Sequence, residues 1–121
     1  MRVKFPVLDL RDKELSLEVR EKKLRITIID HGASASAVFS LPHIPQLITV
    51  FTMMSTGLSN KESVGGEEGY LVVELGKGKW ILRVGDGMGG NRRAVTINRR
   101  DLLTIKHAVD LASSIMIGGK E

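Results

Sequence analysis

The sequence has 121 residues, of which 42% are hydrophobic and 26% charged, a composition typical of one folded domain over residues 1–121. Lysine and arginine exceed aspartate and glutamate by 18 to 14, and the absence of cysteine excludes disulfides, thiolate metal sites and cysteine nucleophiles. No apolar run reaches the roughly 20 residues that cross a bilayer, and the first residues lack the apolar core of a signal peptide. We therefore expect a cytoplasmic protein without a membrane partner.

The first half of the chain predicts four strands and a helix. Strands are predicted over residues 3–8, 15–19, 24–28 and 37–41. The middle two alternate apolar and polar side chains on either side of a turn at Glu21 and Lys22, which indicates an antiparallel hairpin with one buried face. Pro42 and Pro45 favour the first turn of a helix, and apolar residues recur at helical spacing from there to Gly57.

The second half predicts a similar series. Strands are predicted over residues 71–75, 80–84 and 94–97. Asn98 is a favourable N-cap for a final helix that ends at the glycine pair 118–119. The segment between Gly57 and Gly69 holds mostly glycine and charge, so a linker is expected over about 59–65 where the first half has its first strand.

The two halves are related by a shift of 56 residues. Residues 15–30 align with residues 71–86, with four identities in sixteen positions and six matched apolar positions. Such a period predicts a duplicated unit, with pseudo-repeat one over residues 1–58 and pseudo-repeat two over 66–119. Antiparallel strands followed by a helix place the protein in the α+β class, as two ββββα-type pseudo-repeats with twisted antiparallel sheets and one helix each. Chance similarity between two amphipathic hairpins is the alternative.

Positive charge is concentrated late in the chain. Residues 77–106 hold eight lysines and arginines against two carboxylates, as a polyanion-binding surface requires. If the apolar residues of both hairpins point inward, the alternate side chains point outward and form one basic surface, which the glycine-rich loop over 85–93 and the start of the last helix extend. The predicted contacts with a nucleic acid are Arg25, Lys79, Arg83, Asn91, Arg92, Arg93, Arg99 and Arg100. A merely solvated basic surface is the alternative.

Aromatic residues make up only 4% of the sequence, although single-strand binders commonly stack bases on aromatic rings. Trp80 shares the parity of the inward residues of its strand, and Phe51 lies on the apolar side of its helix, so both are expected in the core. Tyr70 has the opposite parity and is the predicted stacking residue. Binding should therefore depend mainly on phosphate charge and weaken with salt.

Four antiparallel strands followed by one helix, duplicated in a short basic chain, resemble the PUR repeat of purine-rich-element-binding proteins, the whirly proteins and the positive-cofactor-four coactivators. The segment most similar to a PUR repeat is 79–112. The size and a composition poor in asparagine, glutamine and cysteine, which is typical of a thermophile, also resemble archaeal ThermoDBP-type single-stranded DNA-binding proteins. These resemblances imply single-strand binding on twisted sheets, usually by dimers.

We therefore predict a homodimer that binds single-stranded nucleic acid, DNA more than RNA, with little sequence preference, in the cytoplasm and associated with the nucleoid. No cofactor, metal or small-molecule substrate is expected. The alternative is a protein-interaction or assembly subunit, in which the strongly apolar last helix covers a partner.

An enzyme is not expected. Gly85, Gly87 and Gly90 match a dinucleotide-binding pattern, but a strand and not a helix follows them. The three histidines lack metal-ligand spacing. Asp30 and Asp86 follow matching strands, where they are either a pair of catalytic acids or turn-forming residues.

Overall fold

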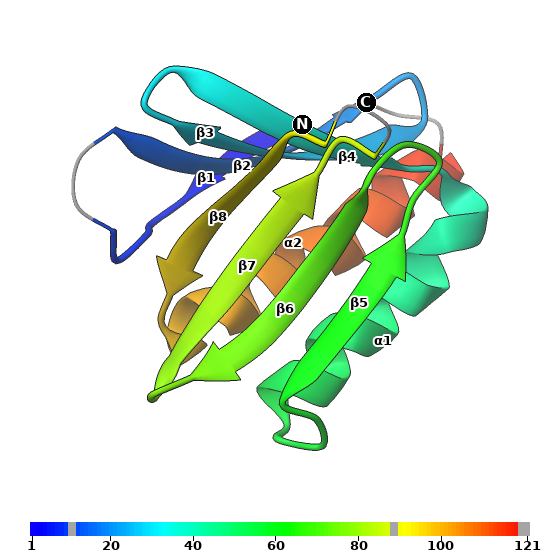
Figure 1. Ribbon diagram of the computed structural model, residues 1–121. Helices are drawn as coiled ribbons and strands as arrows, with labels where there is room; N and C mark the ends of the chain where they lie inside the picture. The colour runs from blue at the N-terminus through cyan, green and yellow to red at the C-terminus, as the bar shows by residue number, and fades with distance from the viewer. Residues whose placement is uncertain (10–11, 88–89, 119–121) are drawn as a thin grey trace.

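The computed structural model describes residues 1–9, 12–87 and 90–118. Two four-stranded antiparallel sheets, each in simple sequential order, are each followed by a helix (Figure 1). The first unit consists of β1 (Arg2–Phe5), β2 (Lys13–Arg20), β3 (Lys23–Asp30), β4 (Ala33–Phe39), a short 3-10 turn (Leu41–His43) and α1 (Ile44–Ser55). The second consists of β5 (Lys61–Gly65), β6 (Tyr70–Gly76), β7 (Lys79–Gly85), β8 (Arg92–Ile97) and α2 (Arg99–Gly118). The fold is therefore α+β, with ββββα twice.

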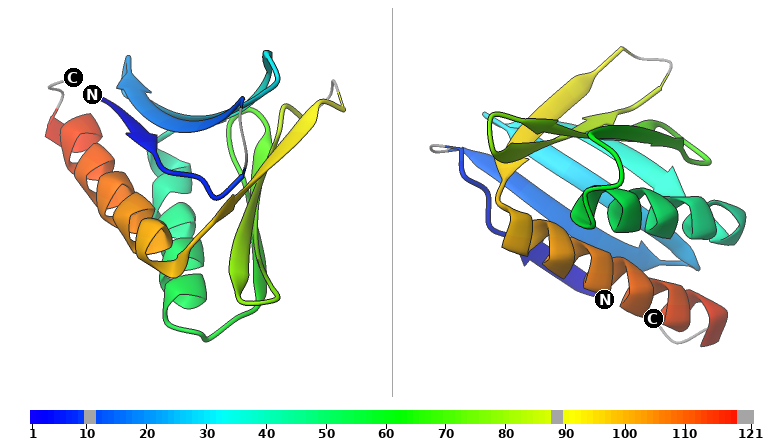
Figure 2. Two further views of the ribbon diagram at one scale, coloured as in Figure 1. Left: turned by 90° about the vertical axis from the view of Figure 1, so that its left-hand side faces the viewer. Right: turned by 90° about the horizontal axis from the view of Figure 1, so that it is seen from below.

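Alternating side chains of both sheets meet in one hydrophobic core. Leu17 pairs with Ile26 in the first sheet and Val73 with Leu82 in the second, and all four are buried. Both helices lie in the angle between the two sheets and cover their inner faces (Figure 2). Phe51 and Trp80, 0% and 6% exposed, are in this core, as the sequence predicts.

The duplicated hairpins have the predicted positions and the same turn. The β2–β3 turn at Glu21 and Lys22 and the β6–β7 turn at Lys77 and Gly78 lie 56 residues apart, and all four residues have positive φ. Two consecutive residues with positive φ form the type I′ turn, whose twist matches that of the strands it joins. The repeat is thus visible in backbone conformation as well as in the hydrophobic pattern.

Several predictions about strands are wrong. The first strand ends at Phe5 and not at Leu8, and the last strand begins at Arg92 and not at Ala94. The expected linker over 59–65 contains β5, which pairs with β6 and buries only Val64; one apolar side chain is too weak a signal to distinguish a strand from a loop. The fourth strand begins at Ala33 and not at Ala37, because small residues face the core there and resemble a loop in the sequence. Both units therefore have four strands.

Helix ends are fixed by short contacts. The side-chain oxygen of Asn98 accepts a hydrogen bond of 2.9 Å from the backbone amide of Asp101, which is the predicted N-cap of α2. The Arg99 guanidinium donates to the Ser55 carbonyl at 3.1 Å, where α1 ends. This contact places a cation at the negative end of the α1 dipole and joins the two helices.

The free edge of β4 is covered by loops of the second unit. Val38 and Glu68, in the β5–β6 loop, exchange two backbone hydrogen bonds of 2.8 and 3.2 Å. The Asp86 carboxylate accepts a hydrogen bond of 2.6 Å from the Ser36 amide. An uncovered edge strand is a template for aggregation, so these contacts protect β4 as well as joining the sheets.

The free edge of β8 is covered in the same way by the first unit. The Leu8 amide donates to the Thr96 carbonyl at 2.7 Å, and the Thr96 amide donates to the Asp9 carboxylate at 2.5 Å. Lys13 donates to the Ala94 carbonyl at 3.2 Å. Because each unit closes the last strand of the other, the two sheets are held in a fixed relation and their outer faces point in different directions (Figure 2).

Candidate nucleic-acid interface

The structure divides the predicted basic surface into two. Arg25 points outward from the first sheet, whereas Lys79 and Arg83 point outward from the second. The prediction that all of these side chains point away from the core is confirmed, but the expectation of one shared surface is wrong. Alternation decides only which side of its own sheet a residue occupies, and the two sheets face different ways.

We call the outward side chains of β5–β8 the second-sheet face. Its paired rows follow the strand register, with Val72 beside Arg83 and Ile81 beside Thr96. Four cations lie on this face against one carboxylate. They are Lys61, Lys79, Arg83 and Arg92, and the carboxylate is Glu74. The face is therefore cationic, with half-buried apolar side chains between the charges.

Tyr70 lies over a glycine on this face. Gly65 and Gly85 are its partners on the two neighbouring strands, and Arg92 is the next residue in the same row. A Cβ atom added at Gly85 would lie 2.3 Å from the Tyr70 ring, so the ring occupies the space that a side chain would fill. Tyr70 is half-buried, whereas the other four aromatic residues are buried in the core.

Arg83 and Glu74 form the strongest ion pair of the face. The guanidinium donates to the carboxylate at 2.6 Å, and Lys61 lies 3.9 Å from the other carboxylate oxygen. The hydrogen bond from Arg83 lowers the pKa of the Glu74 carboxyl below its ordinary value. Glu74 is therefore ionised at neutral pH and neutralises part of the charge of Arg83.

Lys79 and Arg92 are exposed, and within the described part of the chain neither lies within ion-pair distance of a carboxylate. They stand on β7 and β8 on either side of the half-buried Arg83. Cations without a carboxylate partner do not have to break an ion pair before they contact phosphate. Lys79 and Arg92 are therefore the best-placed phosphate ligands of this face.

Besides Arg25, which is on the first sheet, four of the predicted binding residues lie outside the second-sheet face. The Asn91 side-chain amide donates to the Ser34 carbonyl at 2.5 Å and to Asp86 at 3.0 Å, so it joins the β7–β8 loop to β4. Arg93 pairs with Val84 and points to the opposite side of β8 from Arg92. Arg99 holds the end of α1, and Arg100 is exposed on α2. The structure does not bring these four onto the second-sheet face.

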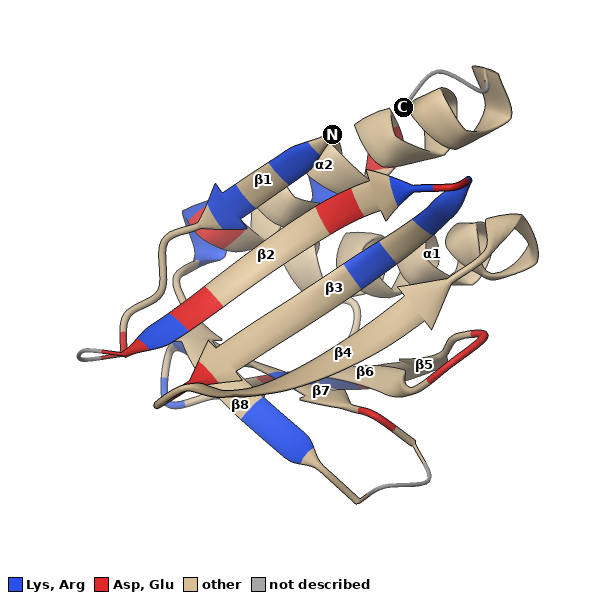
Figure 3. Ribbon diagram, turned by 90° about the horizontal axis from the view of Figure 1, so that it is seen from above, with Lys and Arg blue, Asp and Glu red and all other residues tan. Residues whose placement is uncertain are grey.

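The outward side chains of β1–β4, which we call the first-sheet face, have mixed charge (Figure 3). Five cations of the strands meet four carboxylates, two of which come from the β5–β6 loop. The cations are Arg2, Lys4, Arg20, Lys23 and Arg25, and the carboxylates are Glu14, Glu18, Glu67 and Glu68. Glu67 lies 2.9 Å from Lys23, and its hydrogen bond raises the pKa of that lysine.

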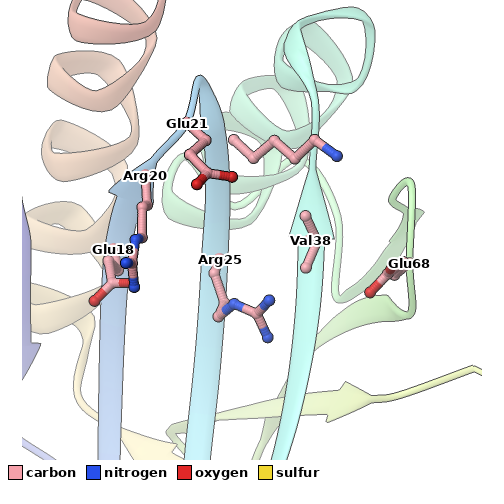
Figure 4. Close-up of a pocket in the computed structure, with 7 residues that line it drawn as sticks. Glu18, Arg20, Glu21, Arg25, Val38 and Glu68 are labelled. Atoms are coloured by element: carbon pink, nitrogen blue, oxygen red, sulfur yellow. The ribbon is translucent and has the colours of Figure 1, made fainter. Parts of the chain in front are cut away.

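A groove of about 360 Å³ crosses the first-sheet face between the β2–β3 hairpin and the β5–β6 loop. Arg25 lies at its centre, with Glu18 on one side and Val38 and Glu68 on the other (Figure 4). Carboxylates on both sides make this groove unfavourable for a polyanion. The Glu67–Glu68 pair is visible in the sequence, but nothing there indicates that it reaches the other unit.

Asp30 and Asp86 do not form one site. The Asp30 carboxylate contacts the His31 ring and lies 3.8 Å from Lys13, and the hydrogen bond with His31 lowers its pKa. The Asp86 carboxylate accepts a hydrogen bond from the Ser36 amide. Among the residues described, no three histidine or carboxylate side chains are grouped to hold a metal ion. Neither helix, over the same residues, combines the length and the hydropathy of a membrane span.

Solved structures show the same fold. A guide RNA-binding protein complex bound to a guide RNA aligns with a TM-score of 0.63 and 11% identity, over 98% of this chain and 91% of that chain. MRP1/MRP2 of Trypanosoma brucei aligns with a TM-score of 0.59 and 12% identity, over 98% and 94%. WHY1 of Arabidopsis thaliana aligns with a TM-score of 0.54 and 14% identity, over 98% and 92%.

The fold is therefore of the whirly type, and the predicted resemblance to whirly proteins is confirmed at the level of fold. No protein-family model matches the sequence, and no curated protein is significantly similar to it. The resemblances to PUR repeats, to positive-cofactor-four coactivators and to ThermoDBP-type proteins remain predictions.

Proposed function

We propose that the protein binds single-stranded nucleic acid on its second-sheet face, without catalysis. The observation that carries this proposal is the row of Tyr70, Gly85 and Arg92. Lys79, which forms no ion pair among the described residues, lies further along the same face. A ring lying over glycine offers a π surface to a base, and the neighbouring cations offer charge to the adjoining phosphates. The guide RNA bound by a protein of the same fold supports this proposal.

Two contributions to affinity are expected. Each phosphate neutralised by a lysine or arginine adds about 0.7 to the slope of log affinity against log salt for a single strand. Stacking of a base on Tyr70 adds about 1–3 kcal/mol. Both contacts ignore base identity, so binding should be largely independent of sequence. We expect DNA to be preferred over RNA.

Fluorescence anisotropy with labelled oligonucleotides tests the proposal. Single-stranded DNA, single-stranded RNA and duplex DNA of one sequence are titrated at two salt concentrations. A single strand should bind more tightly than the duplex, with affinity that falls as salt rises. An affinity that does not change with salt would contradict the phosphate contacts.

A matched pair of double variants locates the site. Lys79→Gln with Arg92→Gln removes two cations from the second-sheet face, and Arg20→Gln with Arg25→Gln removes two exposed cations from the first. The first pair should lower the salt slope by about 1.4 and the second should leave it unchanged. Equal losses in both pairs would place the strand elsewhere.

We also propose that two copies associate through α2. Leu103, Leu111 and Ile117 are 40%, 55% and 73% exposed on this helix, on the far side from the core. Exposed apolar residues on one element favour a protein contact. Light scattering with size-exclusion chromatography should give a dimer, and Leu111→Lys should give a monomer that still binds oligonucleotide. A wild-type protein that is monomeric at high concentration would overturn this second proposal.

A further inference from the structure

The second-sheet face has a hollow of its own, at the end opposite to Tyr70. Its volume is about 470 Å³, and it is lined by Gly76, Lys77, Lys79, Ile81 and Thr96. Gly76 pairs with Lys79, and Ile81 pairs with Thr96, so the hollow spans β6, β7 and β8 on the outward side. A volume of this size is within the range of small-molecule sites, about 300–1,000 Å³.

The missing side chain of Gly76 creates the hollow. A Cβ atom placed there would lie 3.6 Å from the Ile81 Cδ1 atom, in ordinary contact, so any larger side chain would cover the isoleucine. Gly76 does not have positive φ, and therefore its backbone does not require glycine. The open position leaves the apolar surface of Ile81 half-exposed.

Two lysines stand at the rim of this apolar floor. Lys77 has φ 47° in the type I′ turn, and Lys79 follows on β7. Both side chains are exposed, and within the described residues neither is close enough to a carboxylate for an ion pair. An apolar floor beside unpaired cations is complementary to a flat aromatic ring attached to a phosphate.

We propose that this hollow seats one unstacked nucleobase, with Lys77 and Lys79 holding the phosphates on either side of it. This inference rests on the proposed function, and it makes the hollow a second anchor for the strand that stacks on Tyr70. Only a single strand presents an unpaired base without the cost of opening a duplex, about a few kcal/mol per base. The hollow should therefore favour single strands over double strands.

The distance between the two anchors gives a length threshold. Tyr70 and Gly76 are the ends of β6, six residues apart, which corresponds to about 20 Å at about 3.3 Å per residue. A strand whose nucleotides stay stacked between the two anchors, at about 3.4 Å each, needs about six spacings, and so about seven nucleotides, to reach both. Shorter strands occupy one anchor at a time, and longer strands occupy both with the gain of an intramolecular contact.

Affinity for oligothymidylates of about 4 to about 16 nucleotides tests this inference. The wild-type chain should show a step in affinity of about tenfold near about seven nucleotides. Gly76→Val covers the exposed surface of Ile81 at the floor of the hollow without changing charge. It should remove the step in affinity while the salt slope for long strands stays constant. Ser63→Val is the control, because Ser63 is outward and exposed on β5, outside the hollow, and it should keep the step.

The outcomes separate the two proposals. Wild-type protein that binds no single strand overturns the proposed function, whereas binding with no length step, or an unchanged step in Gly76→Val, overturns only the second anchor. If circular dichroism shows that Gly76→Val is unfolded, Ile81→Gln makes the floor polar at an outward position. Loss of the step in that variant supports the inference, and its persistence overturns it.

Discussion

The two sheets share one backbone plan, but their outer faces differ at equivalent positions. In the first sheet, Glu14, Ile29 and Ser34 form one outward row. In the second sheet the equivalent row consists of Tyr70, Gly85 and Arg92. The first sheet thus has a carboxylate where the second has an aromatic ring, and an isoleucine where the second has the glycine beneath that ring. It has a serine where the second has an arginine.

The net charge of the chain therefore does not locate a binding surface. On the first-sheet face, the five outward cations of the strands meet four carboxylates, and Glu21 of the β2–β3 turn lines the same groove. On the second-sheet face, four outward cations meet one carboxylate. Both units supply basic residues, but only the second leaves them beside an aromatic ring and largely free of acids. The duplicated fold gives two similar scaffolds, and the side chains on the rows decide which one can hold a polyanion.

The close approach at Gly69 joins the two sheets and fixes the directions of their outer faces, and Gly69→Ala should disrupt this junction. Gly69 has φ 71°, and an added Cβ atom would lie 2.3 Å from the Gly85 carbonyl oxygen and 3.0 Å from that of Ser36. A clash with backbone atoms in a left-handed conformation cannot be relieved by a side-chain rotation. We expect a loss of about 3 kcal/mol or more in the free energy of unfolding, measured by chemical denaturation.

Gly65→Ala is the matched control for this variant. Gly65 lies four residues earlier on an edge strand, lacks positive φ, and has no atom within 4 Å of an added Cβ. Its free energy of unfolding should change by less than about 0.5 kcal/mol. Equal stability of the two variants would mean that the close approach at Gly69 does not hold the sheets together.

Tyr70→Ala should weaken single-strand binding by the second-sheet face and so reduce the difference between the two faces. Loss of the ring removes the one aromatic side chain that is not in the core, and stacking contributes about 1–3 kcal/mol per base. That range corresponds to about a 5-fold to 150-fold loss of affinity for a single strand, measured by anisotropy. Tyr70→Phe keeps the ring and should bind like the wild type. A similar loss in the phenylalanine variant would assign the effect to the hydroxyl and not to stacking.

Much of the fold is predictable from local signals. Alternation over residues 15–30 and 71–86, the N-cap at Asn98 and the apolar face that includes Phe51 each act within a few residues, so the hairpins, helices and core follow from the sequence. The strand β5 cannot be predicted from the sequence, because its single buried valine gives no hydrophobic periodicity. The outward parity of Tyr70, Lys79 and Arg83 is likewise a local property.

The candidate site is predictable only in part, because contacts between distant segments decide the rest. Asn91 and Ser34 are 57 residues apart in sequence, and no pattern near Asn91 distinguishes a phosphate ligand from a residue that joins a loop to a strand. Arg93 differs from Arg92 by one position in register, which moves it to the other side of β8. The pairing register of β8 can be predicted only when its first residue is known. The glycine-rich loop before it gives no sequence signal for where the strand begins.

Glu67→Gln should weaken the contrast by making the first-sheet face more cationic. The carboxylate of Glu67 lies 2.9 Å from Lys23 and comes from the opposite unit, so its loss frees a lysine beside Arg25. We expect the affinity of this face for a short oligonucleotide to rise about threefold to tenfold, with stoichiometry moving from one toward two per chain in calorimetry at low salt.

Asp110→Asn provides the same change in net charge at a distance from both faces. Asp110 pairs with Lys106 on α2 at 3.3 Å. Its affinity and stoichiometry should match those of the wild type. If both variants gain affinity equally, the effect belongs to the net charge of the molecule and the β5–β6 loop does not shield the first-sheet face.

The smallest expected effect concerns Glu74, the one carboxylate of the second-sheet face. The hydrogen bond from Arg83 lowers the pKa of Glu74 below its ordinary value of 4.5, so the pair is intact at neutral pH. Its contribution to stability is present above the pKa that Glu74 has in the unfolded chain and is lost as pH falls through the lowered value. Protonation in that acidic window frees Arg83 for phosphate, and Glu74→Gln should have the same effect at pH 7, with affinity about twofold to threefold higher.

Asp110→Asn is also the control for Glu74→Gln, because it removes one negative charge on α2, away from both faces. It should leave single-strand affinity unaltered. Titration from pH 7 to below the lowered pKa of Glu74 should raise the affinity of the wild type and of Asp110→Asn toward that of Glu74→Gln, so the difference in affinity between the variants narrows with acid. A constant difference would show that ionised Glu74 does not compete with phosphate for Arg83, and equal gains in the two variants at pH 7 would assign the effect to the net charge of the molecule.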